Sequence, residues 1–227
     1  MKQHKKLDRR LDRIENFDKR SKNFPMEALL PNKAYDKPVS KVWPCRKWLD
    51  QGSEGACVAF GWCHELIAAP KQLRTITESD AFNVYRYAQT IDEWPGEAYS
   101  GTSVLAGVKA VQHFWPNYIK EYRWGFSLRD MIATLGYHGP IVLGLRWYRS
   151  MYKPDSKGIL KVTAAQGVAG GHCILARGVD VRRELIILRN SWGKNWGLNG
   201  DCKIRFSDME FLLNNGGEQC IPVRRGR

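Results

Sequence analysis

One stretch of this chain, residues 57–69 (CVAFGWCHELIAA), is apolar on nearly all sides, and Pro70 follows it directly. A helix of that composition is normally buried at the centre of a protein, and a proline cannot continue it. The sequence therefore predicts a central, buried helix that begins at Cys57. The preceding loop, residues 51–55, contains two glycines that permit a tight turn onto the helix.

The two halves of the chain differ in their patterns. The first half predicts two further helices, over residues 79–90 and 103–114. The second half carries short β-prone runs between Gly and Asn clusters, over residues 140–147, 173–176, 184–189 and 203–206. We therefore expect an α+β protein with two lobes, and 227 residues with 43% hydrophobic content are enough to give it a sizeable core.

The six cysteines and the charge limit the classes of protein to consider. A chain of this size needs no disulfides, so we expect the cysteines to be free thiols. The sequence contains no CxxC pair, so we expect no metal, and we expect no cofactor. The formal charge of +13 fits either a solvated basic surface or attraction to an acidic polymer such as nucleic acid or bacterial wall. The sequence contains no RNP, zinc-finger or helix-turn-helix pattern that would support binding to nucleic acid.

Cys57 is the candidate nucleophile. The amino terminus of a helix presents free N–H groups and a partial positive charge, which should lower the pKa of a thiol there by roughly one to five units. The side-chain amide of Gln51 and the backbone N–H of Cys57 could together stabilise the oxyanion that forms when a carbonyl is attacked. From this loop alone, a buried structural cysteine remains an equal alternative.

His172 and Asn190 are the candidate base and its orienting group. His172 follows two glycines and opens an apolar run, so it is expected at the start of a buried strand. Asn190 follows a predicted strand and begins the sequence NSWG. Its carbonyl oxygen can accept a hydrogen bond from the far ring N–H of His172, and Trp192 could shield that bond from water. Taken alone, His172 is better explained as a core histidine and Asn190 as a turn residue after a strand. Together with Cys57, they occur along the chain in the order Cys, His, Asn.

These segments resemble the papain-like cysteine peptidases. The resemblance rests on QGS and GAC around the nucleophile and on NSWG, WG and NG around Asn190. Two positions depart from the family pattern: Glu54 replaces a disulfide cysteine of many secreted members, and Val58 replaces the usual Trp. The Cys-to-His spacing is also shorter than the family's roughly 130–150 residues, which indicates trimmed surface loops.

The resemblance implies a papain-like fold, with a helical lobe, a strand-rich barrel lobe and a cleft between them. It assigns catalysis to Cys57, His172, Asn190 and Gln51. It also implies that Gly101, Gly171 and Trp192 bind substrate, since a glycine backbone leaves room for an added peptide strand.

The expected function is a cysteine endopeptidase that acts on peptide or protein substrates through a thioester. Two alternatives stay open: an acyl-transfer enzyme acting on cell-wall peptides, and an inactive papain-fold binding protein. The amino terminus lacks the apolar region of a signal peptide, and no stretch reaches the roughly 18–20 apolar residues of a membrane span. We therefore expect a cytoplasmic protein without a membrane span, with later release left open.

Residues 1–38 are expected to be a basic segment and linker, ahead of a peptidase domain over residues 39–227. Leu7, Leu11, Ile14 and Phe17 recur at helical spacing, and basic residues flank them. The segment could brace the enzyme's own body, tether it to an acidic partner or polymer, or block the cleft. The first two alternatives are favoured, so deletion of residues 1–23 is expected to change peptidase activity by no more than a few-fold.

Overall fold

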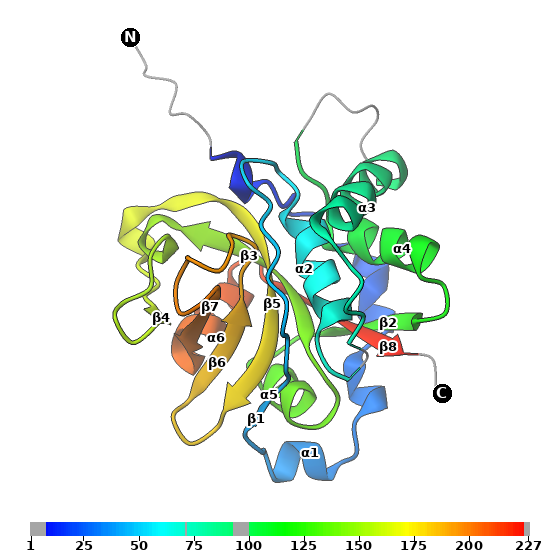
Figure 1. Ribbon diagram of the computed structural model, residues 1–227. Coiled ribbons are helices and arrows are strands. Elements are labelled where there is room, and N and C mark those ends of the chain that lie inside the picture. The colour runs from blue at the N-terminus through cyan, green and yellow to red at the C-terminus, as the bar shows by residue number, and fades with distance from the viewer. Residues whose placement is uncertain (1–7, 71, 93–99, 225–227) are drawn as a thin grey trace.

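The computed structural model describes residues 8–70, 72–92 and 100–224, which form two lobes (Figure 1). Helices α2, α3 and α4 gather on one side of the molecule. Most strands of a mostly antiparallel sheet lie on the other side, and the β2–β8 end of the sheet extends to α4. The helices are α1 (Lys33–Asp36), α2 (Cys57–Ile67), α3 (Glu78–Ile91), α4 (Val104–Phe114), α5 (Leu128–Tyr137) and α6 (Phe206–Asn214). The strands are β1 (Lys41–Val42), β2 (Ile119–Gly125), β3 (Ile141–Tyr148), β4 (Ile159–Leu160), β5 (Val168–Asp180), β6 (Leu185–Arg189), β7 (Asp201–Arg205) and β8 (Glu218–Arg224).

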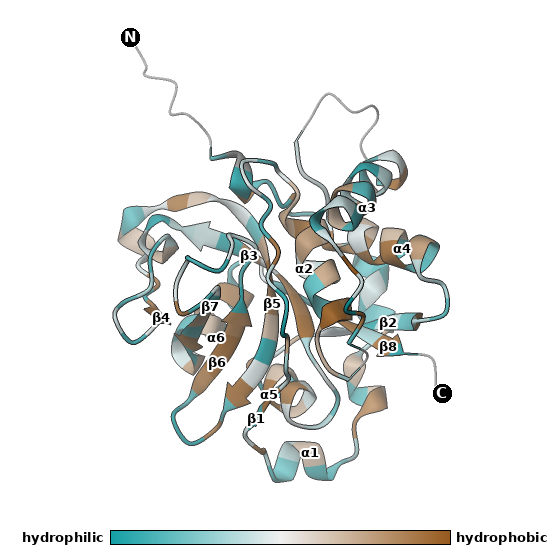
Figure 2. Ribbon diagram, viewed as in Figure 1, coloured by the Kyte–Doolittle hydropathy of each residue, from teal (hydrophilic) through white to brown (hydrophobic). Residues whose placement is uncertain are grey.

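Helix α2 is the centre of the helical lobe, as its composition predicted. Every residue from Cys57 to Ile67 is buried, and α3 and α4 pack against this helix. The two outer helices start at side-chain caps: Thr77 forms a capping box with Asp80 at α3, and Ser103 accepts from the first turn of α4. Figure 2 shows the hydrophobic residues gathered on α4 and on the inner strand β6.

Strand β5 joins the two lobes. The sheet has the order β2-β8-β3-β5-β6-β7-β4, with β1 paired separately to β5. Side chains alternate along β5: Cys173 and Leu175 belong to the hydrophobic core around α2, whereas Ile174 and Ala176 belong to the core of the strand-rich lobe. A single strand therefore carries residues of both lobes, which confirms the predicted two-lobed α+β architecture.

Sequence patterns did not predict β2, β8, α5 and α6, nor the short elements α1, β1 and β4. The helical spacing of Leu11, Ile14 and Phe17 does not produce an α-helix in the structure, and Leu7 lies outside the described residues. Only short 3₁₀ turns form, at Arg9–Leu11 and Lys19–Asn23, each begun by an aspartate cap. Between them the backbone is extended because it bonds to other parts of the protein, which supply the hydrogen-bond partners that a helix would have supplied internally.

All six cysteines are free, as expected, and all of them are buried: Cys45, Cys57, Cys63, Cys173, Cys202 and Cys220. Within the described ranges, no helix combines the length and the apolar character that crossing a bilayer requires.

Candidate active site

The loop before Cys57 is tied to the opposite lobe. The Gln51 N–H donates to the Ser191 carbonyl at 2.9 Å, and Asp50 forms a β-bridge with Trp192. Gly52 adopts a φ of +60°, a left-handed conformation that favours glycine. These contacts bring the amino terminus of α2, and thus Cys57, against the loop that follows β6.

The side chain of Gln51 is buried and held in one orientation. Its Oε1 accepts from the Ser191 hydroxyl at 2.6 Å, which leaves the amide nitrogen to donate. That nitrogen donates to the Glu54 carbonyl at 2.6 Å and to the Arg10 carbonyl at 3.3 Å. The amide thus already contacts a peptide carbonyl of a separate segment, which is the kind of contact that an oxyanion donor makes.

His172 and Asn190 are in contact, as the sequence predicted. The distance from His172 Nε2 to Asn190 Oδ1 is 2.8 Å, and Ser191 N–H donates to the same oxygen. Since a carbonyl oxygen can only accept, Nε2 must carry a proton, and in the neutral ring Nδ1 is then the basic nitrogen. Burial lowers the pKa of His172 to about 4. The hydrogen bond to Asn190 and the nearby Arg10 carbonyl both act to raise this pKa, but burial outweighs them.

Aromatic rings enclose this pair. The ring of Trp147 lies 4.7 Å from that of His172, and the ring of Trp192 lies 5.1 Å from it. Both distances join ring centroids. Trp192 therefore occupies the shielding position that the sequence suggested, and Trp147, on β3, completes the cover.

Asp201 anchors the strand end that carries Asn190. Its carboxylate accepts from Arg189 Nε at 2.6 Å and from Arg177 Nη2 at 2.7 Å, and Arg189 Nη1 also donates to the Lys47 carbonyl. Burial disfavours the charge on Asp201, but the two arginines outweigh it and hold its pKa below the ordinary value. This network connects β5, β6 and β7 beside the candidate site.

Replacement of Asp201 by alanine should lower the free energy of unfolding by about 3 kcal/mol, because it leaves the buried Arg189 without its counterion. A carboxylate with a lowered folded-state pKa stabilises the protein above its unfolded pKa and loses that effect as the pH falls. The difference from the wild type should therefore shrink below about pH 4. Urea unfolding at pH 7 and pH 3.5 measures it. The exposed Asp180–Arg183 pair supplies the control, since Asp180→Ala should change stability by less than about 1 kcal/mol.

The amino-terminal segment runs along this site. Arg13 N–H donates to the Gly171 carbonyl at 3.1 Å, and Ile14 N–H donates to the Thr102 carbonyl at 3.0 Å. A Cβ at Gly101 would lie 1.7 Å from the Asp12 carbonyl oxygen, and one at Gly171 would lie 2.1 Å from the Arg13 carbonyl oxygen. Both glycines therefore permit close approach of an extended backbone.

Trp192, the third expected substrate-binding residue, contacts the same segment. The guanidinium of Arg10 lies 4.5 Å from the centroid of its ring, and Asp8 accepts two hydrogen bonds from that guanidinium. Arg20 is likewise paired with Asp18. Several basic side chains of the segment thus have acidic partners within the protein itself.

Burial determines the protonation state of Cys57 in this arrangement. The residue has no exposed surface, and burial raises its pKa to about 11, outweighing the backbone N–H groups of Cys173 and Asp12. The predicted lowering of this pKa is therefore wrong for the covered cleft. The helix terminus is present, but removal of water from around the sulfur disfavours the thiolate more strongly.

The segment's position also bears on the expected effect of deletion. That expectation assumed that the segment leaves the cleft open. Residues 10–14 instead contact Gln51, Gly171 and Thr102, and the Asp12 backbone lies next to Cys57. The cleft-blocking alternative, the least favoured from the sequence, is the one these contacts support.

Sequence reasoning missed three residues of this region. Ser191 orients Gln51, yet only its place beside Asn190 pointed to it. Arg13 and Glu218 form a buried ion pair with Nη2 to Oε1 at 2.6 Å, and Glu218 lies in the unpredicted strand β8. The buried His64, on helix α2, has a structural role, since its Nε2 accepts from the Leu49 N–H.

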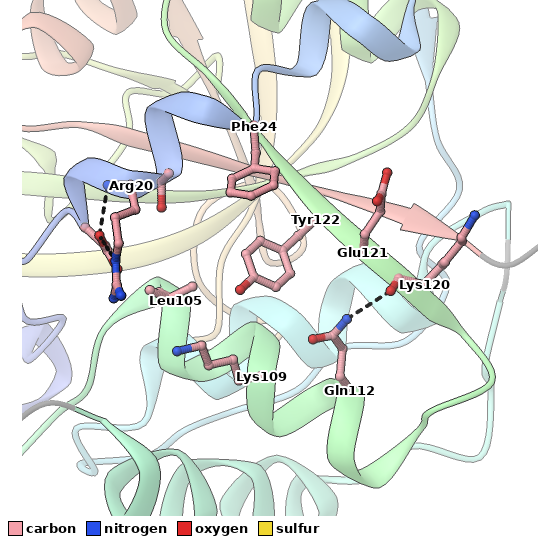
Figure 3. A pocket seen from close by; sticks show the side chains of 10 residues that line it. Arg20, Phe24, Leu105, Lys109, Gln112, Lys120, Glu121 and Tyr122 are labelled. Atoms are coloured by element: carbon pink, nitrogen blue, oxygen red, sulfur yellow. Dashed lines mark hydrogen bonds and ion pairs between the residues drawn. The ribbon is translucent and has the colours of Figure 1, made fainter.

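A pocket of about 490 Å³ lies apart from these residues, between the segment around Arg20, helix α4 and strand β2 (Figure 3). Phe24 and Tyr122 form an apolar part of its wall, with Lys109 and Lys120 among the polar residues that line it. None of the candidate catalytic residues borders this pocket.

Comparisons with known proteins point to one family. A family model described as papain family cysteine protease matches residues 77–215, which include His172 and Asn190. A cysteine protease of Blomia tropicalis is 24% identical over 98 residues, 42% of this chain and 29% of the relative. A peptidase C1-like protein of Acanthamoeba polyphaga mimivirus is 29% identical over 109 residues, 47% of this chain and 34% of the relative. The matched regions thus span about a third of these relatives.

Solved structures share the fold across nearly the whole chain. Xylellain, a cysteine protease from Xylella fastidiosa, superposes with a TM-score of 0.76 at 18% identity and covers 98% of both chains. Procathepsin B from Trypanosoma congolense has a TM-score of 0.58 at 14% identity, over 96% of this chain and 84% of its own. Since the family model matches more than half of the residues, this chain belongs to the papain family of cysteine proteases.

Proposed function

We propose that the chain is a cysteine endopeptidase that uses Cys57 as nucleophile and His172 as base, and that residues 10–14 keep it inactive until they leave the cleft. The observation that carries the proposal is the buried hydrogen bond from His172 Nε2 to Asn190 Oδ1. It holds the imidazole with Nδ1 as the free basic nitrogen, which is the state that can take a proton from a thiol.

The reaction would proceed in two steps. His172 Nδ1 takes the proton of the Cys57 thiol, and the sulfur attacks the carbonyl carbon of the substrate. The Gln51 amide and the Cys57 backbone N–H stabilise the oxyanion, and His172 returns the proton to the leaving amine as the C–N bond breaks. Water then attacks the thioester with His172 as base, which releases the acid product and restores the thiol.

The covered form lacks two requirements of this reaction. The segment occupies the place of an extended substrate, since its backbone bonds to Gly171 and Thr102. It also keeps water away from Cys57, whose pKa of about 11 corresponds to a thiolate fraction of roughly 10⁻⁵ at pH 6. Departure of the segment would admit both water and substrate.

Thiol labelling tests the assignment. A papain-type epoxide at pH 6 should label Cys57 at least tenfold faster in the Arg13→Asp variant than in the wild type, because the substitution places two carboxylates together and expels the segment. The other five cysteines are buried and should stay unlabelled in both proteins. Peptide mapping by mass spectrometry identifies the labelled residue.

Replacement of His172 by alanine in the same background should slow this labelling sharply, because the base is lost. Equal labelling of several cysteines, or labelling that is insensitive to His172→Ala, would indicate a papain-fold protein without the catalytic pair. Analysis of the products from peptides and from cell-wall fragments, with and without an added amine, then distinguishes hydrolysis from acyl transfer.

A further inference from the structure

Arg189 is a buried arginine that directly precedes Asn190 in the chain, and none of the catalytic steps involves its side chain. That side chain is only 2% exposed. Its Nε and Nη2 donate to the two carboxylate oxygens of Asp201 at 2.6 Å and 3.2 Å, and its Nη1 donates to the Lys47 carbonyl at 2.8 Å. Each nitrogen of the guanidinium thus has an acceptor, which holds the side chain in one position.

The two acceptors of Arg189 belong to different lobes. Asp201 is its register partner in the ladder between β6 and β7, within the strand-rich lobe. Lys47 lies between Cys45 and Leu49, which both belong to the hydrophobic core around α2. The guanidinium therefore spans the boundary between the lobes. Its planar array of donors suits this arrangement, because several acceptors can be bonded at once in a fixed geometry.

On the side of the helical lobe, this connection leads to Cys57. The Leu49 N–H donates to Nε2 of His64 at 3.1 Å, and His64 lies on α2 about two turns after Cys57. On the side of the strand-rich lobe, Arg189 is covalently joined to Asn190. The placement of Asn190 relative to the helix of the nucleophile therefore depends on the bonds that Arg189 makes.

The side chain of Asn190 is anchored only through its oxygen. Oδ1 accepts from His172 Nε2 and from the Ser191 N–H, whereas Nδ2 is buried and has no hydrogen-bond partner among the described residues. An amide group can form bonds through both its oxygen and its nitrogen, and here half of that capacity is unused. The position of the Asn190 side chain is therefore set mainly by the backbone that carries it.

We propose that Arg189 is a positioning residue: its bonds to Asp201 and Lys47 hold Asn190 where it orients the His172 ring toward Cys57. This inference rests on the proposed peptidase function, because it concerns the same catalytic pair. A displaced imidazole slows proton transfer but leaves the backbone groups that bind peptide in place. Loss of the Arg189 side chain should therefore lower kcat and leave KM nearly unchanged.

Arg189→Met in the Arg13→Asp background tests the proposal. Methionine removes all the donors, while Arg177 still neutralises the Asp201 carboxylate. We expect kcat for a fluorogenic peptide to fall at least tenfold and KM to change less than threefold. Epoxide labelling of Cys57 should slow at least tenfold as well. A folded variant that keeps the kcat of its parent would overturn the proposal.

Arg177→Met is the matched control. Arg177 also donates to Asp201, at 2.7 Å and 3.2 Å, and to a backbone carbonyl, that of Trp43 at 3.0 Å. This variant thus loses an equivalent set of bonds at a residue that is not adjacent to Asn190. It should lower the melting temperature but change kcat less than threefold. An equal loss of kcat in both variants would show that the network is only structural and would refute the role of Arg189.

Arg189→Lys guards against failure to fold. It keeps a positive charge beside Asp201, but a single ammonium cannot reproduce the planar set of three donors. Its kcat should lie between those of the parent and of Arg189→Met, again with KM nearly unchanged. A kcat equal to the parent's would contradict the role of the bond to Lys47.

A spectroscopic measurement separates this inference from the proposed function. In the wild-type chain the proton on His172 Nε2 is buried and bonded to Asn190 Oδ1, so ¹⁵N NMR should show slow exchange with water. Arg189→Met should speed this exchange at least tenfold, whereas Arg177→Met should change it less than threefold. That result would support the positioning role even if no peptide were hydrolysed. Unchanged exchange in Arg189→Met would overturn it even if hydrolysis were observed.

Discussion

Replacement of Cys57 by alanine in the Arg13→Asp background should reduce kcat/KM for peptide hydrolysis by roughly 10⁴-fold or more, because loss of a nucleophile removes the covalent route entirely. The Gln51 amide and the bound geometry would remain, but they stabilise an oxyanion that no longer forms. A fluorogenic peptide assay with active-site titration of the parent measures the loss.

Cys63→Ala is the matched control, since Cys63 lies on the same helix and is equally buried. It should lower the melting temperature somewhat but retain the activity of the folded protein. If the Cys57→Ala protein kept more than about 1% of the parent's activity, another residue would have to be the nucleophile. The circular-dichroism spectrum of each variant shows whether it is folded.

Displacement of the amino-terminal segment should have the second-largest effect on peptide hydrolysis. Deletion of residues 1–16, or Arg13→Asp in the full chain, should raise kcat/KM at least a hundredfold over the wild type. The reason is competition: a tethered peptide acts at an effective concentration of the order of millimolar, so even modest contacts keep the cleft occupied. A hundredfold restraint at that effective concentration requires an affinity of about 10 μM or tighter, so a synthetic peptide of residues 8–17 should inhibit the deletion variant at about micromolar concentrations.

Arg20→Ala serves as the control for displacement, because the Arg20–Asp18 pair is exposed and lies beyond the cleft contacts. It should leave the activity of the full chain unchanged. Leu11 belongs to the buried core of the strand-rich lobe, so the melting temperature of the deletion variant must be measured as well. A folded variant with wild-type activity would show that the segment does not restrain the enzyme.

Sequence patterns were sufficient to predict the elements whose composition is distinctive. The apolar composition of residues 57–69 predicted a buried central helix, and the structure has α2 there. By contrast, β8 was missed although it completes the sheet, because the sequence EQCIPVR contains a proline and no regular alternation. Helix α5 was missed too, although its Ser127–Asp130 capping box is a readable signal.

Some features of the candidate site were likewise predictable from the sequence, and others were not. Cys57, His172 and Asn190 were identified from motifs, because each motif is a short run of residues with its own local geometry. The orientation of Gln51 was not readable, since it depends on Ser191, which is 140 positions away along the chain. Contacts of this kind arise only when two lobes pack together.

The sequence by itself determined the α+β class, the buried helix and the order of the catalytic candidates, because these follow from composition, periodicity and short motifs. The tertiary structure alone decided that Cys57 is protonated, because burial outweighs the favourable helix terminus. It also decided where the first residues of the chain lie. Arg13 reaches Glu218 across 205 positions, and no local pattern encodes a partner at that distance.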